Sequence, residues 1–175
     1  IRFTTLTLVA TLLAAAAAPA LAQQKPPLSP PAKASATIGA ATITIDYAQP
    51  SMRGRTIMGA LVPYDKVWRT GANAATTLKT TAALDFGGTL VPAGTYTIYT
   101  LPGEKGWKLI LNKQTGQWGT QYDQAQDLAR VDLTVGATSA PVEQFTIALA
   151  GTGGPAGLLT MEWENTKLTF PFTVK

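Results

Sequence analysis

The run Thr42–Tyr47, TITIDY, decides the fold, because polar and apolar side chains alternate along it. Ile43, Ile45 and Tyr47 fall on one face of an extended chain, while the residues between them fall on the other. A strand with one apolar and one polar face is typical of an antiparallel sheet that covers a core on one side only. The run therefore predicts β-structure, and the rest of the chain follows the same pattern.

The alternation recurs in five later runs, with turn clusters rich in glycine and proline between them. The runs are Trp107–Leu111, Val131–Val135, Phe145–Leu149, Leu159–Trp163 and Leu168–Val174. Turn clusters include Pro92-Ala93-Gly94 and Glu164-Asn165-Thr166. Short strands at this spacing predict an all-β, antiparallel β-sandwich, jelly-roll-like, with about ten strands between Ala36 and Lys175.

The N-terminal residues predict export. Arg2 precedes the uncharged apolar run Leu6–Ala18, and Ala20-Leu21-Ala22 has the small residues of a cleavage site, so residues 1–22 are interpreted as a signal peptide. The apolar run is shorter than the roughly 20 residues that a membrane-spanning helix needs. Residues 23–35 are proline-rich and predict an extended linker. We expect a periplasmic or secreted product with no lipid-anchor cysteine and no membrane span after cleavage.

Composition excludes several classes of chemistry. The chain has no cysteine and no histidine, so Ser-His-Asp and Cys-His catalysis and zinc sites built from nitrogen and sulfur ligands are excluded. No glycine-rich phosphate loop is present. Removal of Arg2 with the signal peptide leaves 13 basic and 10 acidic residues, an excess too small and too scattered for nucleic-acid binding. The sequence predicts no metal ion and no cofactor.

Carboxylate-pair chemistry is compatible with this composition, because glycoside cleavage requires only two acids. The candidate pairs are Asp123 with Asp127, and Glu162 with Glu164. A solvated strand face explains the two glutamates more simply, and an arginine partner explains Asp127. We therefore predict no catalytic residue and keep a carboxylate-dependent glycan hydrolase as the alternative.

Candidate ligand-binding residues gather in two segments, Arg53–Thr81 and the long polar loop Gln114–Ala129, in which a single helical turn is expected near Tyr122–Leu128. Arginine and asparagine suit an anionic or hydroxylated ligand, and exposed aromatic rings supply stacking walls. Long loops on a β-scaffold often carry function, although this one could also fold over an open end of the sandwich. The candidates are Arg55, Trp68, Arg69, Asn73, Trp118, Tyr122, Asp123 and Asp127.

Arg69 has two competing interpretations. In the structural one, which we favour at this point, Arg69 pairs with Asp123 or Asp127 and fixes the long loop, while Trp68 on the opposite face fills the core. In the functional one, Arg69 binds a ligand. Gly71 is expected to have a positive φ, and Asn73 is expected to hydrogen-bond within its own turn.

The segment Gly54–Thr77, GRTIMGALVPYDKVWRTGANAATT, resembles the signature of a bacterial secreted family known as domain of unknown function 2911. Val91–Tyr96, the Trp107–Asn112 strand, Trp118-Gly119 and Leu159–Glu164 fit the same family. The resemblance implies an exported, β-rich domain and assigns no activity.

These observations together predict an exported, non-catalytic module that binds a glycan or peptidic ligand or contacts the cell envelope. Two alternatives remain at this point: the glycan hydrolase, and a structural component of an envelope assembly. A cleft holding two carboxyl groups would favour the hydrolase. An exposed apolar patch or a long unpaired edge strand would favour the structural component.

Overall fold

The structure, a computed structural model, describes residues 27–175. The predicted signal peptide, residues 1–22, and residues 23–26 of the predicted linker lie outside the described residues. The strands are β1 Pro31–Ile38, β2 Ala41–Ala48, β3 Thr76–Thr80, β4 Leu84–Phe86, β5 Thr89–Val91, β6 Gly94–Leu101, β7 Trp107–Asn112, β8 Asp127–Gly153 and β9 Ala156–Val174. One 3-10 helix, η1 Gln124–Gln126, lies in the predicted helical turn of the long loop.

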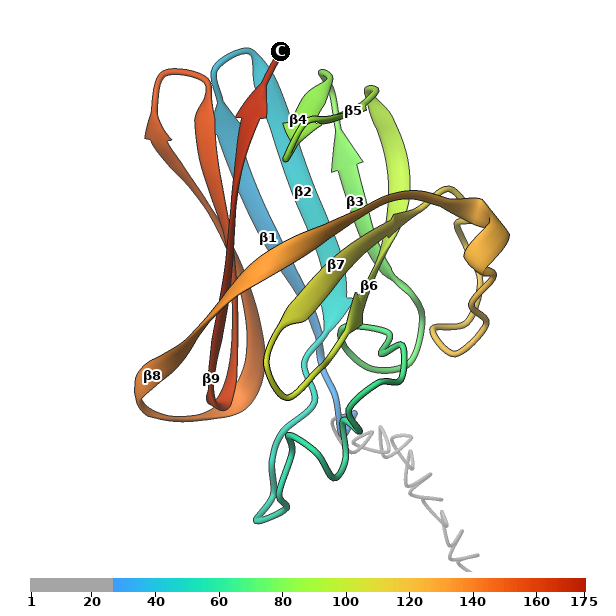
Figure 1. The fold of residues 1–175 in the computed structure, drawn as a ribbon, viewed down its shortest axis with the longest axis vertical. Coiled ribbons are helices and arrows are strands. Elements are labelled where there is room, and N and C mark those ends of the chain that lie inside the picture. The colour runs from blue at the N-terminus through green and yellow to red at the C-terminus, as the bar shows by residue number, and fades with distance from the viewer. Residues whose placement is uncertain (1–26) are drawn as a thin grey trace, which may run out of the picture.

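The strands form one open antiparallel sheet in the order β1-β2-β3-β6-β7-β8-β9-β4-β5, as Figure 1 shows. Most neighbours in the sheet are consecutive in the chain, and the hairpin of β4 and β5 joins the far edge by pairing with the end of β9. The prediction of an all-β antiparallel fold is confirmed, with nine strands in the described residues against the expected ten.

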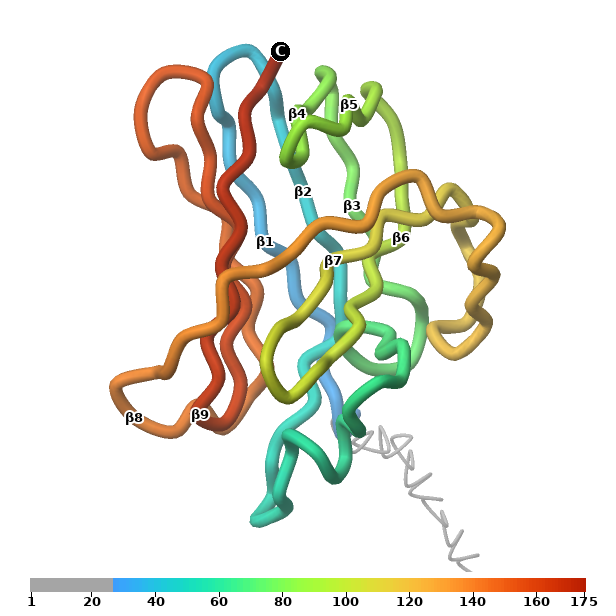
Figure 2. Tube along the Cα trace, in the orientation of Figure 1, coloured from blue at the N-terminus to red at the C-terminus, as the bar shows by residue number. Residues whose placement is uncertain are grey.

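Strand β8 connects two parts of this sheet. Its first residues pair with β7 as far as Leu133, and from Thr134 onward it pairs with β9. Figure 2 shows β8 running obliquely to the lower left, where it turns back on itself before it reaches the hairpin to β9. The two parts face each other across one hydrophobic core, where Tyr47 of β2 meets Phe145 of β8 edge to face with ring centroids 5.9 Å apart. The core therefore lies between two layers, as in a sandwich.

The alternation that predicted the sheet also predicts which side chains are buried. Ile43 and Ile45 are fully buried. On the other layer, Phe86 of β4 stacks on Phe170 and Phe172 of β9, with centroids 5.2 and 5.6 Å apart. Burial of such faces provides the main stabilisation of a chain without disulfides.

The predicted turn at 164–166 is confirmed, because β9 reverses its direction there: Glu164 has φ = 54°, and Val174 N donates to Pro155 O at 2.9 Å. Two other details of the sequence prediction need correction. Strand β1 begins at Pro31, inside the segment predicted as a linker, because it pairs with β2 over its whole length. Val135 is 46% exposed rather than buried, because β8 bends where it changes its partner from β7 to β9.

Two long loops meet at one end of the sheet. Residues 49–75 connect β2 to β3, and residues 113–126 connect β7 to β8. Backbone hydrogen bonds join them: Gly119 N donates to Asn73 O at 3.1 Å, and Ala75 N donates to Gln117 O at 3.3 Å. The strands thus bring together the two segments that contain the predicted site residues. None of the helical structure in residues 27–175 has the length and apolar character needed to cross a membrane.

Candidate functional site

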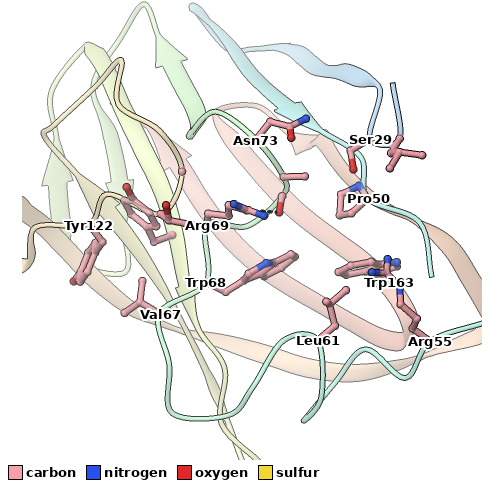
Figure 3. Close-up of a pocket in the computed structure, with 16 residues that line it drawn as sticks. Ser29, Pro50, Arg55, Leu61, Val67, Trp68, Arg69, Asn73, Tyr122 and Trp163 are labelled. Atoms are coloured by element: carbon pink, nitrogen blue, oxygen red, sulfur yellow. Dashed lines mark hydrogen bonds between the residues drawn. The ribbon is translucent and has the colours of Figure 1, made fainter. Parts of the chain in front are cut away.

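A cavity of about 510 Å³ lies where the two loops meet the sheet. Figure 3 shows its lining side chains, which come from residues 28–29 before β1, from the β2–β3 loop, from the loop before β8, and from β6 and β9. Five predicted site residues line it, namely Arg55, Trp68, Arg69, Asn73 and Tyr122. The cavity size is within the range typical of small-molecule sites.

Stacked indoles form one wall of the cavity. The rings of Trp68 and Trp163 lie 5.7 Å apart and within 18° of parallel, and Phe145 packs edge to face on Trp68 at 4.9 Å. Trp163 is almost fully buried, and its Nε1 donates to Glu143 O at 3.1 Å. Trp68 is held by two backbone hydrogen bonds with Thr100, of 2.8 and 3.0 Å. This wall is therefore fixed by packing and hydrogen bonds on both sides.

The backbone just after Arg69 is strained. Thr70 has φ = 53°, which is rare for a β-branched residue. Its hydroxyl is within hydrogen-bond distance of Trp68 O and Thr100 Oγ1, and its carbonyl accepts from Thr76 Oγ1 at 2.7 Å. Gly71 follows with φ = 151°, and a Cβ there would lie 2.9 Å from Thr76 Oγ1. The expected positive φ at Gly71 is confirmed, and buried hydrogen bonds hold a local strain that is often found at functional sites.

Arg69 extends into the cavity without an acidic partner. Its Nε donates to Gly71 O over 3.4 Å, a long hydrogen bond, and no ion pair to Arg69 is present within residues 27–175. Its stem lies on Gly119, where an added Cβ would come within 2.7 Å of Arg69 Cδ. The favoured prediction that Arg69 pairs with Asp123 or Asp127 is wrong. Asp127 pairs with Arg130, and Asp123 caps η1 by accepting from Ala125 N.

Arg55 adds a second cation at the rim. Its Nε donates to Met52 O at 2.9 Å, and its Nη2 donates to Ser51 O at 2.7 Å, so the side chain is folded onto its own loop. The loop in turn is held by Glu164, whose carboxylate accepts from the backbone amides of Ile57 and Met58 at 3.2 and 3.1 Å. The charge of Arg55 is thus held at the rim of the cavity, and two of its guanidinium nitrogens donate to the backbone of its own loop.

Asn73 lies at the edge of the cavity with φ = 61°. Its carbonyl accepts from Gly119 N, so its backbone joins the two loops. The expected hydrogen bond from its side chain within its own turn is absent among residues 27–175, because the left-handed backbone conformation directs this exposed side chain outward.

Tyr122 closes the opposite side of the cavity, next to Tyr99, with the two rings edge to face at 4.9 Å. Its hydroxyl donates to Asp127 Oδ2 at 2.6 Å and accepts from Arg130 Nη2. Burial of the phenol, reinforced by the carboxylate of Asp127, raises the pKa of Tyr122 to about 12. Tyr122 therefore presents its ring to the cavity while its hydroxyl is used elsewhere.

Three predicted site residues do not line the cavity. Asp123 caps η1 and Asp127 belongs to the ion pair with Arg130. Trp118 is 52% exposed and its backbone forms a bridge with Ala74 beside the cavity. Sequence reasoning also missed lining residues, including Leu61, Val67, Tyr99 and Trp163. Leu61 and Val67 lie in the quoted signature, but nothing in the sequence indicated that Trp163 of β9 would stack on Trp68.

No aspartate or glutamate lines this cavity. Glu162 pairs with Lys167 at 2.9 Å, and Glu164 is bound to backbone amides as described above. Asp123 and Asp127 are linked through Asn112, whose amide donates to Asp123 O and to Asp127 Oδ1. Both candidate carboxylate pairs are thus engaged with the protein's own groups. The cavity is lined by two arginines and holds no acid–base pair.

Comparison with known proteins gives one match. The family model described as "Protein of unknown function (DUF2911)" matches residues 29–172. Comparisons with curated proteins and with solved structures gave no match. The matched range includes both loops and every strand that lines the cavity.

Proposed function

The chain belongs to the DUF2911 family, whose function is unknown, and we propose that it is an exported, non-catalytic module that binds an anionic ligand, a glycan or a peptide, in the cavity beside Arg69. The observation that carries this proposal is the guanidinium of Arg69, which extends into a cavity lined by two arginines and no carboxylate. A guanidinium has five N–H donors, and protein groups in residues 27–175 accept only the Nε–H of Arg69, so its remaining donors are available to a ligand.

The electrostatics of the cavity favour an anion. A concave site lined by charges of one sign raises the local concentration of oppositely charged ligands. The Nη atoms of Arg69 can bind a carboxylate or phosphate through two parallel hydrogen bonds. Arg55 adds charge at the rim, although two of its donors bind the backbone of Ser51 and Met52.

The aromatic residues suit the uncharged part of the ligand. Trp68 is partly exposed at the cavity and is braced from behind by Trp163 and Phe145. The ring of Tyr122 lies on another side. Rigid aromatic walls lose little conformational entropy when a ligand packs on them, which supports a binding role.

Export is part of the proposal and is supported by the sequence of residues 1–22. We expect the mature protein to begin at Gln23 and to reside in the periplasm or outside the cell. N-terminal sequencing of the protein recovered from periplasmic and culture fractions tests this. A product that retains residues 1–22 and stays in the cytoplasm would contradict it.

The binding proposal is tested by calorimetry on a panel of short peptides, acidic sugars and inorganic phosphate, with neutral analogues of each. We expect at least one anion to bind, and Arg69→Lys to weaken that binding. Lys105→Ala removes an exposed charge that does not line the cavity and serves as the matched control. Equal affinity for an anion and its neutral analogue would contradict the proposal. An equal change of affinity in Arg69→Lys and Lys105→Ala would also contradict it.

The alternative roles have less support. A carboxylate-dependent hydrolase needs two acids facing its substrate, and the cavity offers none. A component of an envelope assembly would be expected to expose one apolar patch. In the described residues, the exposed apolar side chains are divided: Leu28 and Leu61 line the cavity, whereas Leu90 and Val135 lie on β5 and β8.

A further inference from the structure

A second cavity continues the first. It has a volume of about 500 Å³ and lies along residues 27–31, the end of β2 and the start of β3. Ser29, Ala72 and Asn73 line both cavities, so the two spaces adjoin at these residues. Two adjoining cavities make a track that suits a chain-like ligand better than a compact one.

The charged groups of the two cavities differ in how they are paired. The second cavity contains one carboxylate, Asp46, which forms ion pairs with Lys33 at 3.1 Å and Lys79 at 3.6 Å. Its other walls include the apolar surfaces of Pro27, Pro31 and Ala74. The first cavity carries the unpaired charge, at Arg69. A complementary ligand has one anionic end and an uncharged, largely apolar body.

We propose, building on the function above, that this track binds the C-terminal end of an extended peptide, with its terminal carboxylate on Arg69 and its body passing Asn73 into the second cavity. The last side chain is apolar and packs between Trp68, Leu61 and Val67. Leu61 is 44% exposed in the ligand-free protein, so covering it removes apolar surface from water.

Hydrogen-bonding capacity favours a peptide over an acidic sugar. Each sugar ring has several hydroxyl donors, and a buried donor without an acceptor is costly. The first cavity has no carboxylate to accept from them, and the hydroxyl of Tyr122 is already bound to Asp127 and Arg130. A peptide terminus presents one carboxylate, few donors and an apolar side chain, which matches the lining.

The test is calorimetry on the purified protein with a tetrapeptide of three alanines followed by leucine. The probes are its free acid, its C-terminal amide, a glucuronic acid disaccharide and inorganic phosphate. We expect the free acid to bind, and amidation to weaken binding about 10- to 100-fold, the range for losing a charge-assisted hydrogen-bonded pair. Arg69→Lys should weaken binding of the free acid similarly, since lysine cannot form the bidentate pair, and Lys105→Ala should not.

The second cavity is tested separately with Ala74→Glu, which places a bulky charge in that cavity only. The variant should weaken binding of the tetrapeptide several-fold. It should leave the binding of N-acetyl-leucine unchanged, because that probe reaches only the first cavity. Equal effects on both probes would contradict the two-cavity track.

The outcomes separate this inference from the function on which it rests. Equal binding of amide and free acid, or binding of glucuronate or phosphate in preference to the peptide, overturns the peptide inference. Arg69-dependent binding of glucuronate or phosphate would leave the anion-binding function in place. Binding of none of the probes, including the anions, contradicts both.

Discussion

Arg130 bonds to the hydroxyl of Tyr122, and Arg69 lines the same cavity as Tyr122, but the two arginines differ in their partners. Arg130 Nε donates to Asp127 Oδ2 at 2.7 Å, and its Nη2 donates to Tyr122. The hydrogen bond to Asp127 raises the pKa of Arg130 above its ordinary value. Among residues 27–175, Arg69 has only a long hydrogen bond to Gly71 O. Where a protein satisfies one arginine fully and holds another open in a cavity, the first supports the fold and the second is available to a ligand.

The largest expected effect on stability is at Arg130, the arginine that is paired with an acid. Asp127→Ala should lower the free energy of unfolding by about 2–3 kcal/mol, because it leaves Arg130, Tyr122 and Asn112 without their common acceptor. The Asp127 side chain is only 11% exposed, so water replaces it poorly. Urea unfolding measures the change. Asp132→Ala, which removes the 82% exposed partner of Lys108, is the matched control and should cost under about 1 kcal/mol.

A smaller effect is expected at the strained turn that aims Arg69. Gly71→Ala should lower the free energy of unfolding by about 1–2 kcal/mol, because an L-residue resists φ = 151° and its Cβ would crowd Thr76 Oγ1 and Ala48 O. The control is Gly106→Ala, where the added Cβ meets nothing within 4 Å. A destabilisation equal to that of Gly106→Ala in thermal and urea unfolding would show that the turn is not strained.

Arg69→Lys should change the free energy of unfolding least among these variants, by under about 1 kcal/mol, because no ion pair is lost. Its effect should add to that of Asp127→Ala within about 0.5 kcal/mol, as for residues without a shared partner. A double-mutant cycle in urea tests this. Strong non-additivity would restore the interpretation that Arg69 stabilises the fold through Asp127.

The last expected effect is confined to high pH, where the stability should depend on the titration of Tyr122. The pKa of Tyr122 is about 12 in the folded protein against its ordinary value of 10.0, so the unfolded chain loses this proton first as the pH rises. Stability from this group is complete below pH 10 and falls as the pH passes from about 10 through 12. Unfolding curves across that range should decline less steeply for Tyr122→Phe than for the parent. An identical decline would show that Tyr122 does not titrate as described.

Alternation of side chains was sufficient to predict the sheet, because burial of one face fixes strand register wherever it occurs. It also predicted most buried residues, including Ile43 and Ile45. Alternation failed at Val135, where β8 changes its partner from β7 to β9. Such features depend on which strands meet, which one sequence does not reveal.

The same limit applies to the candidate site. Local chemistry predicted Arg55, Trp68, Arg69, Asn73 and Tyr122, all of which line the cavity. It did not predict the ion pairs correctly, because Asp127, the expected partner of Arg69, pairs with Arg130 in the structure. The stack of Trp68 on Trp163 joins residues almost a hundred positions apart, and no short-range pattern indicates it.

The contrast between the two arginines is tested most directly by NMR of their side-chain Nε–H groups. Without ligand, the Nε–H of Arg130 should exchange slowly with water, because it is bound to Asp127, and that of Arg69 should exchange rapidly. Adding carboxylate ligands from the panel should shift and protect Arg69 while Arg130 stays unchanged. Slow exchange of Arg69 in the free protein, or no response of Arg69 to any of these anions, would contradict the account.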